Sequence, residues 1–122
     1  YNMNNVQKKD EKKIIKSIIE GMKNKKAENI LSLEFSKKHN VNYDFFVICE
    51  GNSTTHVNSI SESIIENIII KNKIKPNSKE GLENKTWILL DYFNIIIHIF
   101  HKNTRKLYNI EDIWYDTILT EY

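Results

Sequence analysis

A continuous apolar run that stops at a glycine and leads into a helical pattern constrains this chain more than any other feature. Phe45–Cys49 are all apolar, and Gly51-Asn52-Ser53 ends the run. Such a run is typical of a strand that is covered on both faces. From Val57 to Ile68, apolar residues recur at helical spacing, behind hydroxyl side chains that can cap a helix. A buried strand that leads directly into a helix predicts an α/β domain.

Strands and helices are expected along the whole chain. A helix is expected at about residues 8–24, and a second one follows the capping side chains of Gly51–Thr55 and continues to about Asn72. In both, apolar residues recur at a spacing of three to four. A short helical tail with Leu107, Tyr108, Ile110, Ile113 and Trp114 is expected near the C-terminus. Alternation or continuous apolar runs predict four strands, which are Glu28–Phe35, Asp44–Glu50, Thr86–Tyr92 and Ile95–His101.

The order α-β-β-α-β-β-α predicts the α/β class, with a mixed four-stranded sheet flanked by helices. The unit across residues 44–92 is expected to form a right-handed crossover between parallel strands, with antiparallel hairpins on either side. Residues 72–85 are largely polar and contain Pro76 and Gly81. A stretch of this length without a clear apolar pattern predicts a functional or mobile loop.

Length and composition limit the class of protein. The chain has 122 residues, 40% of them hydrophobic, which suits one domain with a single core. We assign residues 8–118 to that domain and expect residues 1–7, where Tyr1-Asn2 precede Met3, to be disordered or vector-derived. The lone Cys49 excludes a disulfide framework. No apolar run approaches the roughly 20 residues that span a bilayer, and the N-terminus is polar. We therefore expect a cytoplasmic protein with no membrane partner.

Charge is distributed unevenly along the chain. Residues 1–28 hold eight Lys and four acidic residues, a balance of +4, and residues 103–122 hold two basic and four acidic residues, a balance of −2. A basic N-terminal helix could lie near a polyanion such as RNA. Lys, Asn and Ile are abundant throughout, so a solvated helix face is the preferred interpretation of these lysines.

The turn Gly51-Asn52-Ser53 is the first candidate for chemistry. Backbone N–H groups at a strand-to-helix turn can hold a phosphate, although the spacing of the common glycine-rich phosphate motifs is absent. A nucleotidyltransferase would also need two carboxylates one residue apart on the next strand, to hold divalent metal. The next acidic residues are Glu62 and Glu66, which fall on the following helix. We therefore expect a capped turn, no nucleotidyltransferase chemistry and no cofactor.

The histidines do not form a metal-binding pattern. His98 and His101 lie three residues apart on a strand and so point to opposite faces of the sheet. His39 falls in a loop, and His56 falls in the first turn of a helix. Because no nucleophile is evidently placed beside them, we expect neither a metal site nor catalytic residues.

A two-residue turn at Phe93-Asn94 would place varied side chains on one face of a hairpin. In that register Asp91 lies diagonal to His98, within reach of a hydrogen bond, and a structural polar pair is the preferred interpretation. Trp87 begins its strand directly after the polar loop, so core burial and partial exposure both stay open. The residues on this face are Trp87, Leu89, Asp91, Ile96, His98 and Phe100.

Several short motifs, in order along the chain, resemble one known family. They are Asp44–Ile48 with Gly51-Asn52-Ser53 and His56-Val57, then Glu80-Gly81 with Trp87–Asp91, and finally His98–Phe100, Arg105, Leu107-Tyr108 and Glu111–Trp114. Their order and spacing are similar to those of the ribosomal silencing factor (Iojap-like) family over about residues 10–116. The resemblance implies a nucleotidyltransferase-like fold without the catalytic carboxylates. The chain departs from the family at the hairpin turn, where Phe93-Asn94 replaces the common Gly-Asp.

The resemblance also implies a function. Members of this family bind the large ribosomal subunit, chiefly large-subunit ribosomal protein fourteen. They block joining of the small subunit and so repress translation. This implies a protein that is not an enzyme, with ribosomal RNA nearby, and it leaves a homodimer open. A nucleotide- or RNA-processing enzyme that uses the Gly51–Ser53 turn is the alternative.

The expected partner-binding residues lie on the hairpin, on the loop before it and on the segment after it. Arg105 is the only arginine of the chain, and its planar fork of donors suits a geometric contact that Lys cannot match. Internal pairing of Arg105 with Asp91 or Glu111 is the alternative. The expected set is Glu80, Gly81, Trp87, Asp91, His98, Arg105 and Tyr108.

Overall fold

The structure is a computed structural model, and it describes residues 8–36, 41–113 and 116–122. In chain order, its elements are α1 (Lys8–Asn24), β1 (Glu28–Glu34), β2 (Phe45–Gly51), α2 (Thr54–Asn72), β3 (Ser78–Glu80), β4 (Trp87–Tyr92), β5 (Ile95–His101), α3 (Lys102–Tyr108), α4 (Ile110–Ile113) and β6 (Ile118–Glu121). The strands in these residues form one six-stranded mixed sheet in the order β3-β4-β5-β2-β1-β6. The α/β class expected from the sequence is confirmed.

β3 and β6 extend the expected four-stranded sheet by one strand at each edge. β3 lies inside residues 72–85, which the sequence led us to interpret as a loop, and all of its residues are exposed. β6 follows the helical tail, begins at the last residue of the expected domain and is exposed along its length. Neither strand shows the apolar alternation of a half-buried strand, so the sequence pattern did not reveal them.

The strand directions correct the expected crossover. β2 pairs in parallel with β5, and β4 is antiparallel to β5, so β4 runs opposite to β2. The prediction that residues 44–92 connect two parallel strands is therefore wrong. β3 is antiparallel to β4 and runs in the same direction as β2, so the chain returns from α2 into β3. The error arose because the short polar β3 was missing from the expected order. The antiparallel hairpins β1–β2 and β4–β5 are confirmed.

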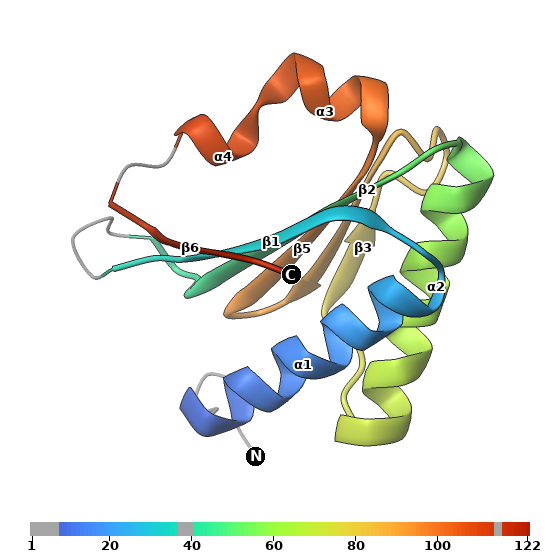
Figure 1. Cartoon of the computed structure of the whole chain (residues 1–122). Coiled ribbons are helices and arrows are strands. Elements are labelled where there is room, and N and C mark those ends of the chain that lie inside the picture. The colour runs from blue at the N-terminus through green and yellow to red at the C-terminus, as the bar shows by residue number, and fades with distance from the viewer. Residues whose placement is uncertain (1–7, 37–40, 114–115) are drawn as a thin grey trace.

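Helices cover the two faces of the sheet unequally. α1 and α2 lie on one face, and α3 and α4 lie over the other (Figure 1). Among the described residues, no helix is both long and apolar enough to cross a membrane. The core under α1 and α2 contains the fully buried Ile60, Ile64 and Ile68, as their spacing predicts. The smaller cluster on the opposite face contains Leu31, Leu33, Phe35, Phe46, Ile48, Phe100 and Ile110.

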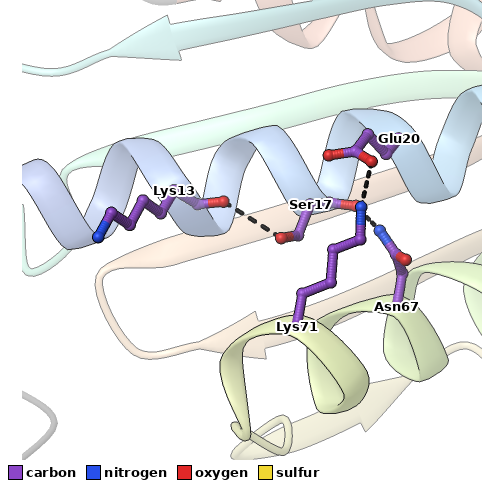
Figure 2. Close-up of polar contacts among 5 residues, drawn as sticks. All are labelled: Lys13, Ser17, Glu20, Asn67 and Lys71. Atoms are coloured by element: carbon purple, nitrogen blue, oxygen red, sulfur yellow. Dashed lines mark hydrogen bonds and ion pairs between the residues drawn. The ribbon is translucent and has the colours of Figure 1, made fainter.

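Polar contacts connect α1 to α2 (Figure 2). Asn67 Nδ2 donates a hydrogen bond to the carbonyl oxygen of Ser17 at 2.7 Å, and Lys71 forms an ion pair with Glu20. Ser17 Oγ donates to the carbonyl oxygen of Lys13, one turn earlier, at 3.2 Å. Because the Lys71–Glu20 pair is exposed, it contributes little to stability. Packing of the apolar stripes and the partly buried Asn67 hydrogen bond therefore hold the two helices together.

The β4–β5 hairpin has the register that the sequence predicts. Leu89 lies opposite His98, and Asp91 lies opposite Ile96. Phe93 occupies the turn with a φ of +69°, in the left-handed region that favours Gly or Asn. Asp91 Oδ1 accepts a hydrogen bond from the Phe93 N–H at 2.7 Å, which stabilises the turn. Phe93 adopts this conformation, and the pairing of β4 with β5 is still the one that a two-residue turn predicts.

Tyr92 carries an unpaired hydroxyl into the core. The residue is 2% exposed, and within the described residues its hydroxyl has no hydrogen-bond partner. Burial also raises the pKa of this hydroxyl above its ordinary value. We expect Tyr92→Phe to raise the free energy of unfolding by about 1 kcal/mol, because the unpaired group is removed and the ring packing stays. Urea denaturation followed by circular dichroism measures this difference.

The exposed Tyr108 provides the control for Tyr92→Phe. Tyr108→Phe removes the same hydroxyl at a site that is 52% exposed, and should leave the unfolding midpoint unchanged. If Tyr92→Phe were less stable than the parent protein, the Tyr92 hydroxyl would have to be paired in solution.

Candidate partner-binding surface

The face of the sheet opposite α1 and α2 is incompletely covered along β3 and β4. Every second residue of β4 is partly exposed on this face, and the residues between them are buried on the other face. The pairs on the partly covered face are Trp87 with Phe100, Leu89 with His98, Asp91 with Ile96, and Glu80 with Leu89. We define the open sheet face as Glu80, Trp87, Leu89, Asp91 and Ile96, together with Tyr108 of α3.

Trp87 is the largest side chain of the open sheet face. Its ring stacks on Phe100, with 4.7 Å between centroids and 29° between planes, and lies 4.8 Å from the ring of Tyr108. Its indole Nε1–H donates a hydrogen bond to His98 Nδ1 at 3.1 Å. The choice that the sequence left open is settled, because Trp87 is partly exposed. The rings of Phe100 and Tyr108 contact the indole, and His98 accepts the hydrogen bond from its Nε1–H. Tyr108 is itself 52% exposed.

His98 lies buried beneath Trp87. Only 3% of its surface is exposed, and its ring makes an edge contact with Phe46, with 4.5 Å between centroids. Because Nδ1 accepts the Trp87 hydrogen bond, the neutral ring carries its proton on Nε2. Nε2 has no hydrogen-bond partner in the described part of the chain. Burial lowers the His98 pKa to about 4, so the ring is neutral at pH 7 and can accept the hydrogen bond.

The lowered pKa of His98 makes stability depend on pH. The unfolded side chain takes up a proton near pH 6.5, whereas the folded one stays neutral down to about pH 4. Between these values the unfolded state binds more protons, so the contribution is present above pH 6.5 and is lost as pH falls. We expect the parent to lose about 2 kcal/mol more than His98→Leu between pH 7 and pH 5. Urea denaturation at the two pH values measures this difference, and equal losses would contradict it.

The polar pair expected between Asp91 and His98 does not form. Asp91 Oδ1 accepts from the Phe93 N–H in the turn, and His98 Nδ1 accepts from Trp87 instead. The register was right, but a backbone N–H two residues away satisfies the carboxylate locally. Asp91 therefore serves the hairpin turn while it remains on the open sheet face.

Gly81 fixes the backbone between β3 and β4. Its φ is +83°, and a Cβ atom at this position would lie 2.0 Å from the carbonyl oxygen of Trp87. Only glycine can occupy such a site without moving the start of β4. Its carbonyl oxygen accepts a hydrogen bond from the Lys85 N–H at 3.0 Å, which closes the turn. Glu80, the residue before it, is exposed at the end of β3. These two residues thus border the open sheet face next to Trp87.

Arg105 is buried in the structure. It is 6% exposed, and its guanidinium donates to the carbonyl oxygen of Asn29 at 2.6 Å and to Glu50 Oε1 at 3.2 Å. The sequence suggested internal pairing with Asp91 or Glu111, and the structure shows an ion pair with Glu50, at the end of β2. The side chain of Glu111 lies outside what the structure describes. Arg105 therefore holds α3 against β1 and β2. Contact between Arg105 and a binding partner stays a prediction.

The Gly51-Asn52-Ser53 turn is occupied by internal hydrogen bonds. Ser53 is the N-cap of α2, and its side chain accepts from the His56 N–H at 3.0 Å. The Asn52 N–H donates to His56 Nδ1 at 2.9 Å. The capped turn expected from the sequence is confirmed. Among residues 8–36, 41–113 and 116–122, no three His, Cys, Asp or Glu side chains cluster as metal ligands would.

Two cavities lie away from the open sheet face. One of about 440 Å³ borders Arg105, Glu50 and Tyr122, and another of about 480 Å³ lies between α1 and β6. Neither is lined by Trp87 or by another residue of the open sheet face.

Sequence reasoning missed some residues that shape this site. Leu89 and Ile96 were placed on the correct face by alternation but were not selected, because apolar residues in a strand normally indicate core. Glu50 was missed as the partner of Arg105, since an acidic residue at the end of a buried strand carries no pairing signal. Two residues considered from the sequence, His39 and Trp114, lie outside the described residues.

The fold and this surface define a mixed α/β domain with a candidate partner-binding face, and known proteins share the fold. The family model described as Ribosomal silencing factor during starvation matches residues 8–121. The Bacillus subtilis ribosomal silencing factor is 34% identical over 92% of this chain and 93% of its own length. A crystal structure of a Bacillus halodurans protein matches with a TM-score of 0.72 and 30% identity, covering 88% of this chain and 97% of that one. The chain belongs to the ribosomal silencing factor family, which confirms the resemblance seen in its motifs.

A mitochondrial protein is also similar. The mouse protein named Mitochondrial assembly of ribosomal large subunit protein 1 is 30% identical over 58% of this chain and 32% of its own length. The similarity therefore covers about a third of the mouse protein.

Proposed function

We propose that this chain binds the large ribosomal subunit through large-subunit ribosomal protein fourteen. In this proposal the bound chain sterically blocks joining of the small subunit and so represses translation. Membership of the silencing factor family supports a role at the ribosome. The name of the mouse relative, which refers to assembly of the large ribosomal subunit, supports the large subunit as partner. The proposed site of action is the cytoplasm.

The observation that carries the proposed contact is the partly exposed, internally fixed indole of Trp87. Trp and Tyr are enriched among the residues that dominate the energy of protein–protein interfaces. A side chain already held in place by Phe100, His98 and Tyr108 loses little conformational entropy on binding. Glu80 and Gly81 lie near Trp87, and Asp91 lies at the other end of β4 on the same face. All three belong to the proposed contact.

The proposed mechanism requires no catalysis. The turn that a phosphate could have used is filled by contacts of Ser53 and His56, which favours a binding protein over a nucleotide-processing enzyme. Steric exclusion needs only that the chain stays bound to the large subunit for longer than an encounter with the small subunit lasts. The mechanism does not depend on whether the chain forms a homodimer. Light scattering of the purified chain measures its oligomeric state.

Truncating Trp87 should abolish most of the affinity for the large subunit. We expect Trp87→Ala to stay folded by circular dichroism and to bind purified bacterial large subunits roughly thirtyfold more weakly, because an aromatic hot spot contributes about 2 kcal/mol or more. Co-sedimentation of the chain with separated subunits, over a range of chain concentrations, measures the change. Thr86→Ala, a truncation of the exposed neighbour, is the control and should bind as the parent does.

Two outcomes would move the proposed surface. If Trp87→Ala stayed folded and bound normally, the open sheet face would not be the interface, and the lysine-rich face of α1 would become the candidate through ribosomal RNA. If the parent chain did not sediment with large subunits, the proposed partner itself would be wrong.

A further inference from the structure

The hydrogen bond between Trp87 and His98 assigns a task to a residue that a partner cannot reach. His98 was expected from the sequence among the partner-binding residues, yet only 3% of its surface is exposed. It touches the open sheet face from below, through the indole Nε1 of Trp87 at 3.1 Å. Any effect of His98 on binding must therefore pass through the residues that cover it, and Trp87 is the one to which it is hydrogen-bonded.

A histidine is an unfavourable choice for packing alone at this position. Its neighbours are the rings of Phe46, Trp87 and Phe100 and the apolar residues paired with it, Ile48 and Leu89. In the described part of the chain its Nε2 has no hydrogen-bond partner, and a buried unpaired N–H is destabilising. Leucine would fill similar space without this penalty. What leucine cannot supply is the acceptor atom for the indole N–H.

The acceptor restricts the orientation of the Trp87 ring. Stacking on Phe100 fixes the plane of the indole but still permits a half-turn of the ring, which keeps this plane and exchanges the two edges. A hydrogen bond to Nε1, on one edge of the ring, distinguishes the two orientations. The contact with Tyr108, 4.8 Å away between centroids, then limits movement toward α3.

We propose that His98 is a positioning residue for recognition of the ribosome, which holds the Trp87 indole in its binding orientation by accepting the hydrogen bond of Nε1–H. This inference rests on the proposed function, because it assumes that Trp87 contacts the partner. His98 itself makes no contact with the partner. His98 keeps the indole of the unbound protein in the geometry that it has when bound. The side chain therefore loses less conformational entropy on binding.

Two substitutions of His98 separate orientation from packing. His98→Leu keeps the volume and removes the acceptor, whereas His98→Asn keeps an acceptor oxygen near the position of Nδ1 but leaves a small void. We expect His98→Leu to unfold at a urea concentration no lower than the parent does, yet to bind purified large subunits about threefold to tenfold more weakly. We expect the opposite order for His98→Asn, which should be less stable but bind nearly as the parent does.

A direct readout of the hydrogen bond accompanies the binding measurement. In ¹⁵N-labelled full chain, the Trp87 indole N–H signal is assigned by its loss in Trp87→Phe. Hydrogen exchange of this N–H should be slow in the parent and in His98→Asn, and fast in His98→Leu. Trp87→Phe should lose affinity to a similar extent as His98→Leu, and the double variant should lose no more, because both remove the same bond.

The outcomes distinguish this inference from the proposed function. If Trp87→Ala loses binding while a folded His98→Leu with a fast-exchanging indole binds as the parent does, the positioning role is wrong and the proposed surface stands. If Trp87→Ala also binds as the parent does, the surface is wrong and the positioning role falls with it. Should His98→Leu fail to fold, a Trp87→Phe variant with parental affinity overturns the positioning role.

Discussion

Replacing Arg105 by methionine is expected to lower the free energy of unfolding by about 3 kcal/mol. The side chain of Arg105 is 8% exposed and pairs with Glu50, whose side chain is 15% exposed. Methionine fills much of the same volume but leaves the Glu50 carboxylate without this partner in a largely buried site. Removing one member of a buried ion pair costs about 3–5 kcal/mol, because the other charge stays desolvated. Urea denaturation followed by circular dichroism measures the loss.

The neighbouring lysine provides a matched control for this substitution. Lys106→Met makes the same change of charge at an exposed position of the same helix and should change stability by less than about 0.5 kcal/mol. Adding Glu50→Gln to Arg105→Met removes the stranded charge and should recover part of the loss. If Arg105→Met were as stable as Lys106→Met, the guanidinium would be free to serve a partner, as the sequence first suggested.

Truncating Ile64 in α2 should be similarly severe. The side chain is fully buried in the core between α2 and the sheet, and Ile64→Ala is expected to cost about 2–5 kcal/mol. The site has little freedom to collapse, because α1 already approaches α2 closely at this point. A Cβ atom on Gly21 would lie 2.8 Å from the Ile64 Cα. The void left by the truncation should therefore persist.

Ile70 offers the comparison within the same helix. It is 59% exposed, so Ile70→Ala should leave the urea midpoint nearly unchanged. Equal stability of Ile64→Ala and Ile70→Ala would show that the orientation of α2 against the sheet is wrong.

The long helices and central strands could be predicted because burial imposed a period on their sequences. α1 begins and ends at the residues expected from its apolar stripe, and β5 spans the expected residues. The edge strands could not be predicted, because no such period marks an exposed strand. Ser78–Glu80 and Ile118–Glu121 are exposed along their length, so no burial pattern marks them, and backbone pairing with β4 and β1 alone defines them.

Strand register predicted which residues of the candidate site share one face of the sheet. Alternation across the Phe93-Asn94 turn placed Trp87, Asp91 and His98 on one face, and the structure agrees. Hydrogen-bond partners were not predictable, because several acceptors lie within reach once a register is set. Asp91 accepts from the turn, His98 accepts from Trp87, and Arg105 of α3 donates to Glu50 at the end of β2.

Subunit joining tests the central claim most directly. Purified bacterial large subunits are incubated with the chain, small subunits are added, and a sucrose gradient separates joined ribosomes from free subunits. We expect the parent chain, at concentrations that saturate the large subunit in co-sedimentation, to shift the profile toward free subunits. Trp87→Ala at the same concentration should leave the ribosomes joined. If ribosomes form to the same extent with the saturating parent chain as without it, this chain does not block subunit joining.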